Sequence, residues 1–395
     1  MSLAKRPLHL HNEKKLFIFW IVLMILWLII TIVSLAFKDN TGRLLADYYD
    51  RYVYFERGKW FPEHKTPISE YPQVPTLLFG INHLTSMWVD KELQPAVYIA
   101  LFSLEMFIVL FLVLRILLKL LPSESSDYAI LMLLPPVLYF VYNRFDILPA
   151  YLCLVAYHNA TKKRWTIVSI VLAIATFTKW YPILLFPGFL MYASVLKAKF
   201  QWKMVLMFIV TSALILLPTY IQGGIDAVLA PYQFHFMRGM ESVALPVLLD
   251  NLLQSIFDIK IGLSYFSLAF LVLQVFAPVM SIFTRMDSLD ALVYYCIIVI
   301  ALFVLFSRIY SPQWFLWLLP FLVISAENKV DVVLIIAYSF TTFLGYPVFF
   351  DIYDGASSIP LQLASLATYL ILGVIIFRAV GNLKWKSTIP IVSAN

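Results

Sequence analysis

The chain has 395 residues, of which 62% are apolar and only 13% are charged, and its mean hydropathy is +0.85. Soluble domains carry about 25% charged residues, so this composition excludes an ordinary soluble protein and indicates an integral membrane protein. The formal net charge is +6, but the basic residues are scattered between apolar segments, which argues against a nucleic-acid partner. Both cysteines, Cys153 and Cys296, lie in apolar segments, so neither a disulfide framework nor a thiolate metal site is expected.

Apolar segments follow one another along nearly the whole chain. They predict an all-α, polytopic membrane protein with about twelve transmembrane helices in a single integral membrane domain, residues 1–395. Several central segments are too short to cross about 30 Å of hydrocarbon at about 1.5 Å per residue, which predicts polar positions below the membrane surface. The predicted helices are roughly 16–37, 96–120, 127–143, 146–158, 165–178, 181–196, 203–221, 261–284, 289–307, 313–326, 331–350 and 359–378.

The basic residues predict how the chain is oriented in the cell membrane. Clusters at 162–164 and 197–203 fall in short connections, and a high density of Lys and Arg in such connections marks the cytoplasmic side. An even number of helices then places both termini in the cytoplasm. Two longer connections, about 38–95 and 222–260, lie on the non-cytoplasmic face. Connections of this length are usually functional or disordered, and the aromatic content of the first argues against disorder.

Ionisable residues gather beside the helix ends on this same non-cytoplasmic side. A charge close to the membrane is costly and usually faces a cavity or a partner, so several that converge predict a functional site. The alternative is that each is an isolated interfacial charge whose side chain reaches the lipid headgroups. The residues come from four connections and are Arg144, Asp146, Lys179, Arg238, Glu241 and Arg308.

The first long connection is rich in tyrosine and acidic residues, beginning with Asp47-Tyr48-Tyr49-Asp50-Arg51-Tyr52. If residues 47–57 are helical, Asp47 and Arg51 are i,i+4 neighbours, which allows an ion pair on an exposed helix. A carboxylate that faces a cavity is the other interpretation. Composition leaves both open.

Five short motifs, taken in order, resemble the GT-C superfamily of polyprenyl-phosphate-sugar-dependent glycosyltransferases, most closely its family 87 of mannosyl- and arabinosyltransferases. They extend over roughly residues 44–350. The chain departs from the family pattern at Gln73, where a second proline is expected, and in the spacing between the first aspartate and its tyrosines. The motifs are the first-connection element with Gly58 and Glu70-Tyr71-Pro72-Gln73, then Arg144-Phe145-Asp146, Thr178-Lys179-Trp180-Tyr181-Pro182, Arg238-Gly239-Met240-Glu241-Ser242 and Ser311-Pro312-Gln313-Trp314.

The resemblance implies an inverting glycosyltransferase that moves a monosaccharide, with mannose favoured, from a polyprenyl-phosphate donor to a lipid or envelope-glycan acceptor. Its active site lies on the non-cytoplasmic face, and no cofactor and no metal are expected. Asp47 is the expected catalytic base, and Asp50 competes for this role because of the altered spacing. The cations expected to line one cavity and hold the donor phosphate are Arg144, Lys179, Arg238 and Arg308.

Further side chains are expected to contact the substrates, although His235 has the alternative of an exposed loop histidine. The chain has no Gly-rich phosphate loop and no soluble nucleotide-sugar domain, which favours a lipid-linked donor. The expected partners are therefore the lipid-linked sugar, a glycan or glycolipid acceptor and membrane lipids. The expected substrate-binding residues are Glu70, Tyr71, Asp146, His235, Glu241 and Gln313.

Two other functions fit the helix count. A secondary transporter usually has repeated halves with polar groups near the bilayer midplane, and neither feature is evident here. A flippase for lipid-linked saccharides would bind the same lipid but has no need for a catalytic carboxylate in the first connection.

Overall fold

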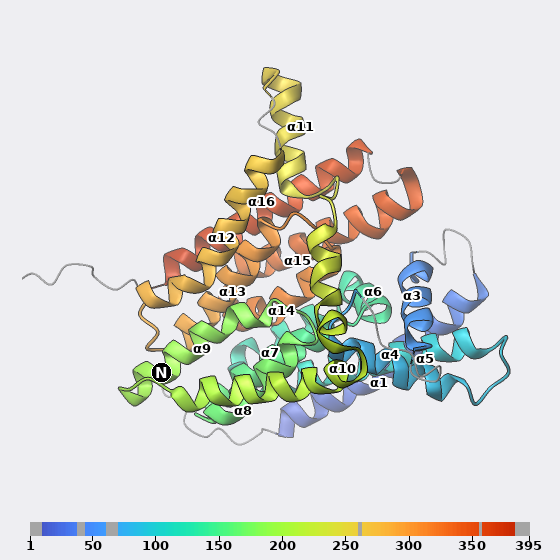
Figure 1. The fold of residues 1–395 in the computed structure, drawn as a ribbon, viewed down its shortest axis with the longest axis horizontal. Helices are drawn as coiled ribbons and strands as arrows, with labels where there is room; N and C mark the ends of the chain where they lie inside the picture. Colours follow the sequence, from blue (N-terminus) through green and yellow to red (C-terminus); the bar gives the residue numbers. More distant parts are fainter. Residues whose placement is uncertain (1–9, 38–43, 61–69, 260–262, 355–357, 384–395) are drawn as a thin grey trace, which may run out of the picture.

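The computed structural model describes residues 10–37, 44–60, 70–259, 263–354 and 358–383. Among these residues all of the elements are helices (Figure 1). In chain order they are α1 (Leu10–Ala36), α3 (Tyr48–Gly58), α4 (Gln73–Ser86), α5 (Gln94–Leu120), η1 (Ser123–Leu133), α6 (Pro135–Asn143), α7 (Ile147–Thr161), α8 (Trp165–Thr176), α9 (Pro182–Lys197), α10 (Trp202–Met237), α11 (Leu245–Phe257), α12 (Leu263–Phe283), α13 (Leu289–Leu305), η2 (Pro312–Trp314), α14 (Phe315–Ser325), α15 (Lys329–Phe343), η3 (Leu344–Asp354) and α16 (Ile359–Asn382).

Each of the twelve predicted apolar segments coincides with helical structure where it is described, and the described residues form an all-α structure compatible with a membrane protein. Within the described ranges, five helices are long and apolar enough to cross a membrane, namely α1, α5, α10, α15 continued into η3, and α16. A sixth is added if η1 and α6, which are bent by 58°, form one span. Several of the remaining apolar helices, such as α8 with 12 residues, are short, as their sequences indicate. The number of twelve crossings therefore stays a prediction.

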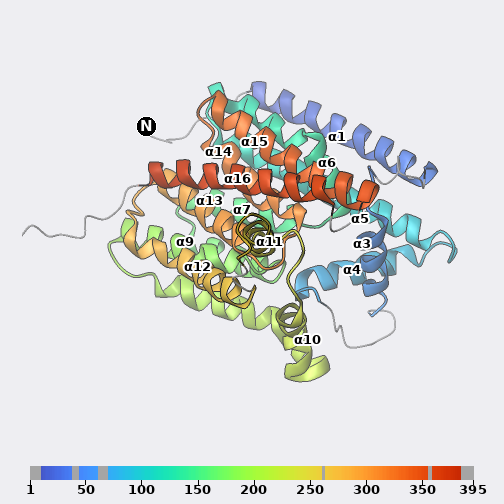
Figure 2. The same cartoon turned by 90° about the horizontal axis from the view of Figure 1, so that it is seen from above.

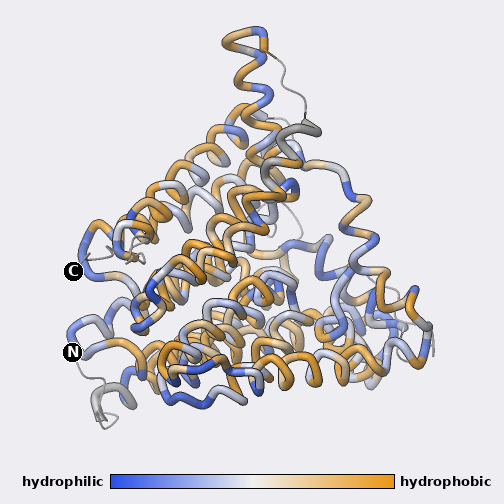
Figure 3. Tube along the Cα trace, turned by 60° about the vertical axis from the view of Figure 1, so that its left-hand side comes forward, coloured by the Kyte–Doolittle hydropathy of each residue, from blue (hydrophilic) through white to orange (hydrophobic). Residues whose placement is uncertain are grey.

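The long helices lie side by side, and their ends gather at two opposite ends of the molecule. α1 begins and α16 ends toward the left of Figure 2, whereas α3 and α4 lie at the right. Figure 3 shows apolar residues along most helices and more hydrophilic residues at the ends and connections. α14 lies in the interior, where every side chain from Phe315 to Val323 is buried. α1, in contrast, exposes large apolar side chains such as Phe17 and Ile32, as a lipid-facing helix does.

Local sequence signals set where several helices begin. Proline occupies the first turn of α5, α6, α9, α11 and α16, where its missing N–H group needs no partner. Ser288, Asn328 and Ser358 cap α13, α15 and α16 with side-chain oxygens that accept backbone N–H groups. These caps fix where three largely apolar helices begin.

The first predicted outside connection contains two helices, α3 and α4, which pack against each other. Gly58 ends α3 so close to α4 that an added Cβ atom would lie 2.4 Å from the carbonyl oxygen of Phe79 and 2.7 Å from the Cβ atom of His83. Glycine is therefore required for this approach. The contact fixes the position of the tyrosine-rich helix at this end of the molecule.

The second predicted outside connection begins inside α10, which is kinked at Gly224. The φ angle of Gly224 is +66°, a conformation that residues with side chains rarely adopt. Beyond the kink, α10 turns out of its first direction and leads to α11, which projects from the bundle in Figure 1. α10 contacts α4, and His235 near the end of α10 lies 3.1 Å from the carbonyl oxygen of Glu70, so the last part of α10 lies at the end of the molecule where α3 and α4 pack.

Candidate functional site

Two cavities lie at the end of the bundle where α3 and α4 pack. Their volumes are about 940 and about 390 Å³, and both fall in the range of about 300–1,000 Å³ that is usual for small-molecule sites. The larger cavity is enclosed by α3, the end of α10, α12 and the segment 303–317. The smaller cavity is closed by α15, η3 and α16. The two are neighbours because they share five residues: Tyr49, Asp50, Arg238, Ser311 and Gln313.

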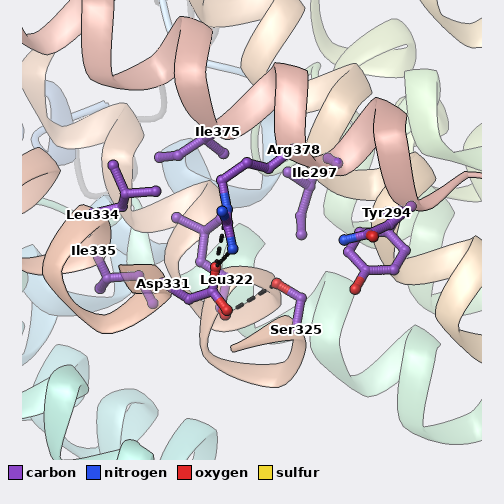
Figure 4. A pocket seen from close by; sticks show the side chains of 11 residues that line it. Tyr294, Ile297, Leu322, Ser325, Asp331, Leu334, Ile335, Ile375 and Arg378 are labelled. Atoms are coloured by element: carbon purple, nitrogen blue, oxygen red, sulfur yellow. Dashed lines mark hydrogen bonds and ion pairs between the residues drawn. The ribbon is translucent and has the colours of Figure 1, made fainter. Parts of the chain in front are cut away.

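A third cavity of about 40 Å³ lies where α16 ends (Figure 4). Its polar feature is the ion pair between Arg378 and Asp331, with Nη2 and Oδ1 2.7 Å apart, which ties α16 to α15. A water molecule occupies about 30 Å³ in the liquid, so this space holds no substrate. We interpret it as a structural contact between two helices.

Asp47 is the N-cap of α3 and is almost completely buried, with 3% of its surface exposed. Its Oδ1 atom accepts the backbone N–H groups of Tyr49 at 3.0 Å and Asp50 at 3.2 Å. Its Oδ2 atom accepts hydrogen bonds from Arg144 Nη2 at 2.5 Å and from the phenol of Tyr346. Both oxygens are thus engaged, and Asp47 lines neither cavity.

The ion pair considered between Asp47 and Arg51 on an exposed helix is wrong, because both side chains are buried. Arg51 Nε donates a hydrogen bond to the backbone carbonyl of Asp47 at 3.0 Å, and its guanidinium lies over the ring of Tyr142. Arg51 therefore stabilises the first turn of α3 through the Asp47 carbonyl. It leaves the Asp47 carboxylate to Arg144.

Asp50, one turn further along α3, occupies a different position from Asp47. Its carboxylate forms an ion pair with Arg144 Nη1, its side chain is 24% exposed, and it lines both cavities. Among the described acidic residues, Asp50 is the one shared by the two cavities. This position makes it accessible to a ligand in either of them.

Three of the four cations predicted to share one cavity do so, and one of these three, Arg238, also lines the smaller cavity. Lys179, Arg238 and Arg308 line the larger cavity, as expected. Arg144 lines only the smaller one and bridges Asp47 and Asp50. Two carboxylates already neutralise its single positive charge, so the expectation that Arg144 lies with the others to hold the donor phosphate is corrected by its position.

Lys179 lies in the connection between α8 and α9, next to two aromatic rings. Its Nζ atom is 3.5 Å from Asp146 Oδ1 and 4.6 Å from the ring centroid of Phe145. Burial lowers the pKa of Lys179 below the ordinary lysine value, although Asp146 acts in the opposite direction. The Trp317 indole donates to Asp146 Oδ1 at 2.8 Å. Asp146 is fully buried and lines neither cavity, so it orients the lysine rather than contacting a ligand.

The end of α10 is tied to the segment after α13 by Arg308 and Glu241. Arg308 Nη2 donates to the carbonyl oxygens of His235 and Phe236, both at 2.7 Å. Glu241 pairs with Arg238 at 2.5 Å and accepts the backbone N–H group of Tyr310 at 3.0 Å. Burial raises the pKa of Glu241, an effect opposed by Arg238 and by the N–H group of Tyr310. Glu241 lines the smaller cavity.

The other predicted substrate contacts surround the larger cavity. Glu70 and Tyr71 line it, and Glu70 Oε2 is 2.9 Å from Arg57 Nε. His235 is partly buried at the end of α10, with Nε2 3.1 Å from the carbonyl oxygen of Glu70, so the alternative of an exposed loop histidine is wrong. Gln313, in η2, lines both cavities.

Two aromatic residues that complete the site, Tyr346 and Trp317, were not among the predicted site residues. Tyr346 contacts Asp47 and also accepts a hydrogen bond from Arg144 at 3.3 Å, and Trp317 holds Asp146. Both residues lie in apolar segments predicted to be membrane helices, where aromatic residues are common. Gly345 and Pro347 around Tyr346 gave the one local sign of irregular backbone.

In the part of the chain that the structure describes, no three His, Cys, Asp or Glu side chains are grouped so that they could hold a metal ion. Comparison of the chain with protein-family models and with curated protein sequences finds no match. The resemblance to glycosyltransferase family 87 therefore rests on the short motifs alone.

Proposed function

We propose that this protein is a membrane glycosyltransferase that moves a sugar from a polyprenyl-phosphate donor to a hydroxyl group of an acceptor. One observation carries the proposal. The Asp50 carboxylate lies where a large cavity with three cations meets a smaller polar cavity. Transfer between two substrates needs such a carboxylate at the boundary between them.

The larger cavity suits a lipid phosphate because it combines positive charge with an apolar wall. The positive charge comes from Lys179, Arg238 and Arg308. An arginine can bind a phosphate through two parallel N–H groups, whereas a lysine provides a compact point charge. The Arg308 guanidinium donates hydrogen bonds to the backbone carbonyls of His235 and Phe236, which are neutral, so its charge is available to an anion. The apolar part of the wall contains Pro246, Leu268, Leu271, Phe303 and Phe306.

Asp50 is the proposed base in the transfer step. It takes the proton of the acceptor hydroxyl while the hydroxyl oxygen forms a bond to the anomeric carbon of the donor sugar. The bond between that carbon and the phosphate oxygen breaks, and polyprenyl phosphate leaves with the electron pair. Fixed cations stabilise the charge that grows on this phosphate. Asp47, whose oxygens are fully engaged, holds Arg144 and the start of α3 in place.

The proposal includes the orientation inferred from the basic connections, with twelve crossings, both termini in the cytoplasm and both cavities near the non-cytoplasmic face. Cysteine labelling tests it on the full chain, because the two native cysteines are completely buried. A cysteine at Lys163 should react only after permeabilisation of the cells. Its labelling from outside intact cells would contradict the orientation.

The direct test offers the purified protein a series of polyprenyl-phosphate sugars and measures the release of polyprenyl phosphate. Asp50→Asn should bind the donor but fail to release product. Arg308→Ala should cut transfer by about 100-fold, as loss of one group that stabilises transition-state charge does elsewhere. Arg285→Ala, which changes an exposed arginine paired with Asp287, is the matched control and should leave transfer unchanged. Movement of the lipid-linked sugar across vesicles without release of polyprenyl phosphate would instead indicate a flippase.

A further inference from the structure

We infer that the smaller cavity binds the accepting end of the acceptor, and that this end is an uncharged polyhydroxyl group such as a sugar ring. The inference rests on the proposed function, because it assigns the second substrate of the same reaction. The inference specifies the chemical class of the acceptor, which the transfer reaction alone leaves open. Three properties of the cavity carry it: its hydroxyl groups, its charge and its contact with Asp50.

Hydroxyl side chains form much of the cavity wall. Thr341 Oγ1 donates to the carbonyl oxygen of Ala337 at 2.9 Å, Thr342 Oγ1 to that of Tyr338 at 2.7 Å, and Thr368 Oγ1 to that of Ala364 at 2.9 Å. Because each of these protons is used inside its own helix, the hydroxyl oxygens keep lone pairs that can accept from a ligand. The Thr342 hydroxyl also lies within hydrogen-bonding reach of the Tyr310 phenol, which lines the same cavity. Ser365 and the amide of Gln313 add further polar groups. A ligand rich in hydroxyl donors complements this surface.

The charges around the cavity disfavour an anionic ligand. Asp50 and Glu241 line it together with Arg144 and Arg238, and each carboxylate is paired with one of the guanidinium groups. Asp47, directly behind Arg144, adds a further negative charge. The two carboxylates and two guanidinium groups that line the smaller cavity therefore give it no net positive charge. The larger cavity is lined by three cations, Lys179, Arg238 and Arg308, and by two carboxylates, Asp50 and Glu70, so its lining is net positive and attracts a phosphate instead.

The position of the cavity places a bound hydroxyl group beside the proposed base. Asp50 and Tyr346 both line the smaller cavity. Asp50 also lines the larger cavity, where the donor is proposed to bind. The remaining wall is apolar and comes from residues such as Phe350 and Leu361, which can pack against the carbon atoms of a sugar ring. A volume of about 390 Å³ leaves the lipid or glycan remainder of the acceptor outside.

Two matched cysteine reporters test this assignment. Ser365→Cys places a thiol in the smaller cavity, and Ser307→Cys places one in the larger cavity. Both serines are nearly buried, at 4% and 7% exposure, and both native cysteines are inaccessible. The rate of reaction with methyl methanethiosulfonate is measured with methyl hexosides, with farnesyl phosphate and with inorganic phosphate. At about ten times its dissociation constant, a ligand that covers the thiol should slow labelling about tenfold.

The expected result is that a methyl hexoside protects Ser365→Cys but not Ser307→Cys. Protection of Ser365→Cys by farnesyl phosphate or inorganic phosphate, or no protection by any methyl hexoside, would overturn the inference. Farnesyl phosphate is expected to protect Ser307→Cys, and failure of this second reporter would count against the proposed donor site independently of the first.

A third variant checks the hydrogen bonds themselves in the Ser365→Cys background. Thr342→Val keeps the shape of the side chain but removes its hydroxyl, so the methyl hexoside concentration needed for protection should rise up to about tenfold. Thr176→Val is the matched control, because Thr176 also donates to its own helix, to Leu172 at 2.9 Å, but lies away from the cavity. An equal effect of both variants would show that Thr342 acts only on the fold.

Discussion

The phenol of Tyr346 donates a hydrogen bond to the Asp47 carboxylate, although the two residues are 299 positions apart in the chain. Tyr346 can reach Asp47 because its backbone leaves the helical conformation inside η3, with φ −139° and ψ 126°. The same phenol accepts from Arg144 Nη2. The C-terminal part of the protein therefore contacts the Asp47–Arg144 pair, which comes from the N-terminal part.

Tyr346→Phe tests whether this contact positions the carboxylates. The variant keeps the ring and removes one hydrogen bond to Asp47 and one to Arg144, so turnover should fall about tenfold, the effect of about one hydrogen bond to a charged group. The KM for the donor should change little, since Tyr346 does not line the larger cavity. Tyr157→Phe, which removes a buried phenol bonded to Leu289, is the control. Equal kcat values for the two variants would show that the Tyr346 phenol does not position the carboxylates.

Lys179 predicts a particular pH dependence of donor binding. Burial lowers its pKa, so it loses its proton at a lower pH than an exposed lysine. Affinity for farnesyl phosphate should fall as the pH rises through this lowered pKa. The stability of the free protein should change in the opposite sense, because the unfolded chain binds the extra proton in this window and the cost of burying the charge disappears as the pH rises.

Lys179→Arg separates this effect from other titrations, because arginine keeps its charge throughout the accessible range. The variant should hold farnesyl phosphate to a higher pH than the wild-type protein does. Binding isotherms across neutral to alkaline pH give the comparison. Identical pH profiles for the two proteins would mean that Lys179 carries no part of the phosphate interaction.

The helices could be predicted from the sequence because apolar length is a strong signal, and each predicted segment coincides with helical structure. The gathering of Asp50, Lys179 and Arg238 around cavities could also be anticipated, since charges beside membrane helices are costly. The separation of Arg144 from Lys179 and Arg308 could not be predicted. Arg144 and Lys179 look alike in sequence, and only the folded positions of Asp47 and Asp50 show that Arg144 is already neutralised.

The irregular parts of the site left only a weak signal in the sequence, such as Gly345 and Pro347 beside Tyr346. Tyr346 lies in the predicted apolar segment 331–350, and nothing in that segment distinguishes a phenol that contacts Asp47 from one at the membrane surface. The turn of α10 depends on one positive φ angle at Gly224, and glycine occurs in membrane helices for many reasons. Long-range contacts of this kind are set by packing, which a single sequence does not reveal.

Gly188 predicts a defined loss of stability. An added Cβ atom would lie 2.2 Å from the nearest ring atom of Tyr295, and this ring is held by hydrogen bonds from its phenol to Leu184 and Pro278. Gly188→Ala should therefore destabilise the protein by about 1–3 kcal/mol, the usual cost of overpacking a core. Gly373→Ala in α16 is the control, because no atom lies within 4 Å of its added Cβ. Thermal unfolding of both variants in detergent decides the matter; an unchanged Tm for Gly188→Ala would show that α9 and α13 can separate freely.

The last prediction distinguishes the two aspartates of α3. Asp50→Asn removes the carboxylate shared by both cavities, so turnover should fall by at least about 100-fold, the low end of general-base contributions. Binding of farnesyl phosphate should persist, because the cations of the larger cavity are unchanged.

Asp47→Asn should behave differently, because asparagine still caps a helix well while Arg144 loses one of its two carboxylate partners. We expect a lower Tm and a partial loss of turnover, with donor binding intact. Measuring Tm, the donor dissociation constant and turnover on both variants separates a base from a positioning residue. An Asp47→Asn protein that is fully stable but inactive, next to an active Asp50→Asn protein, would assign the base to Asp47, as the sequence resemblance implies.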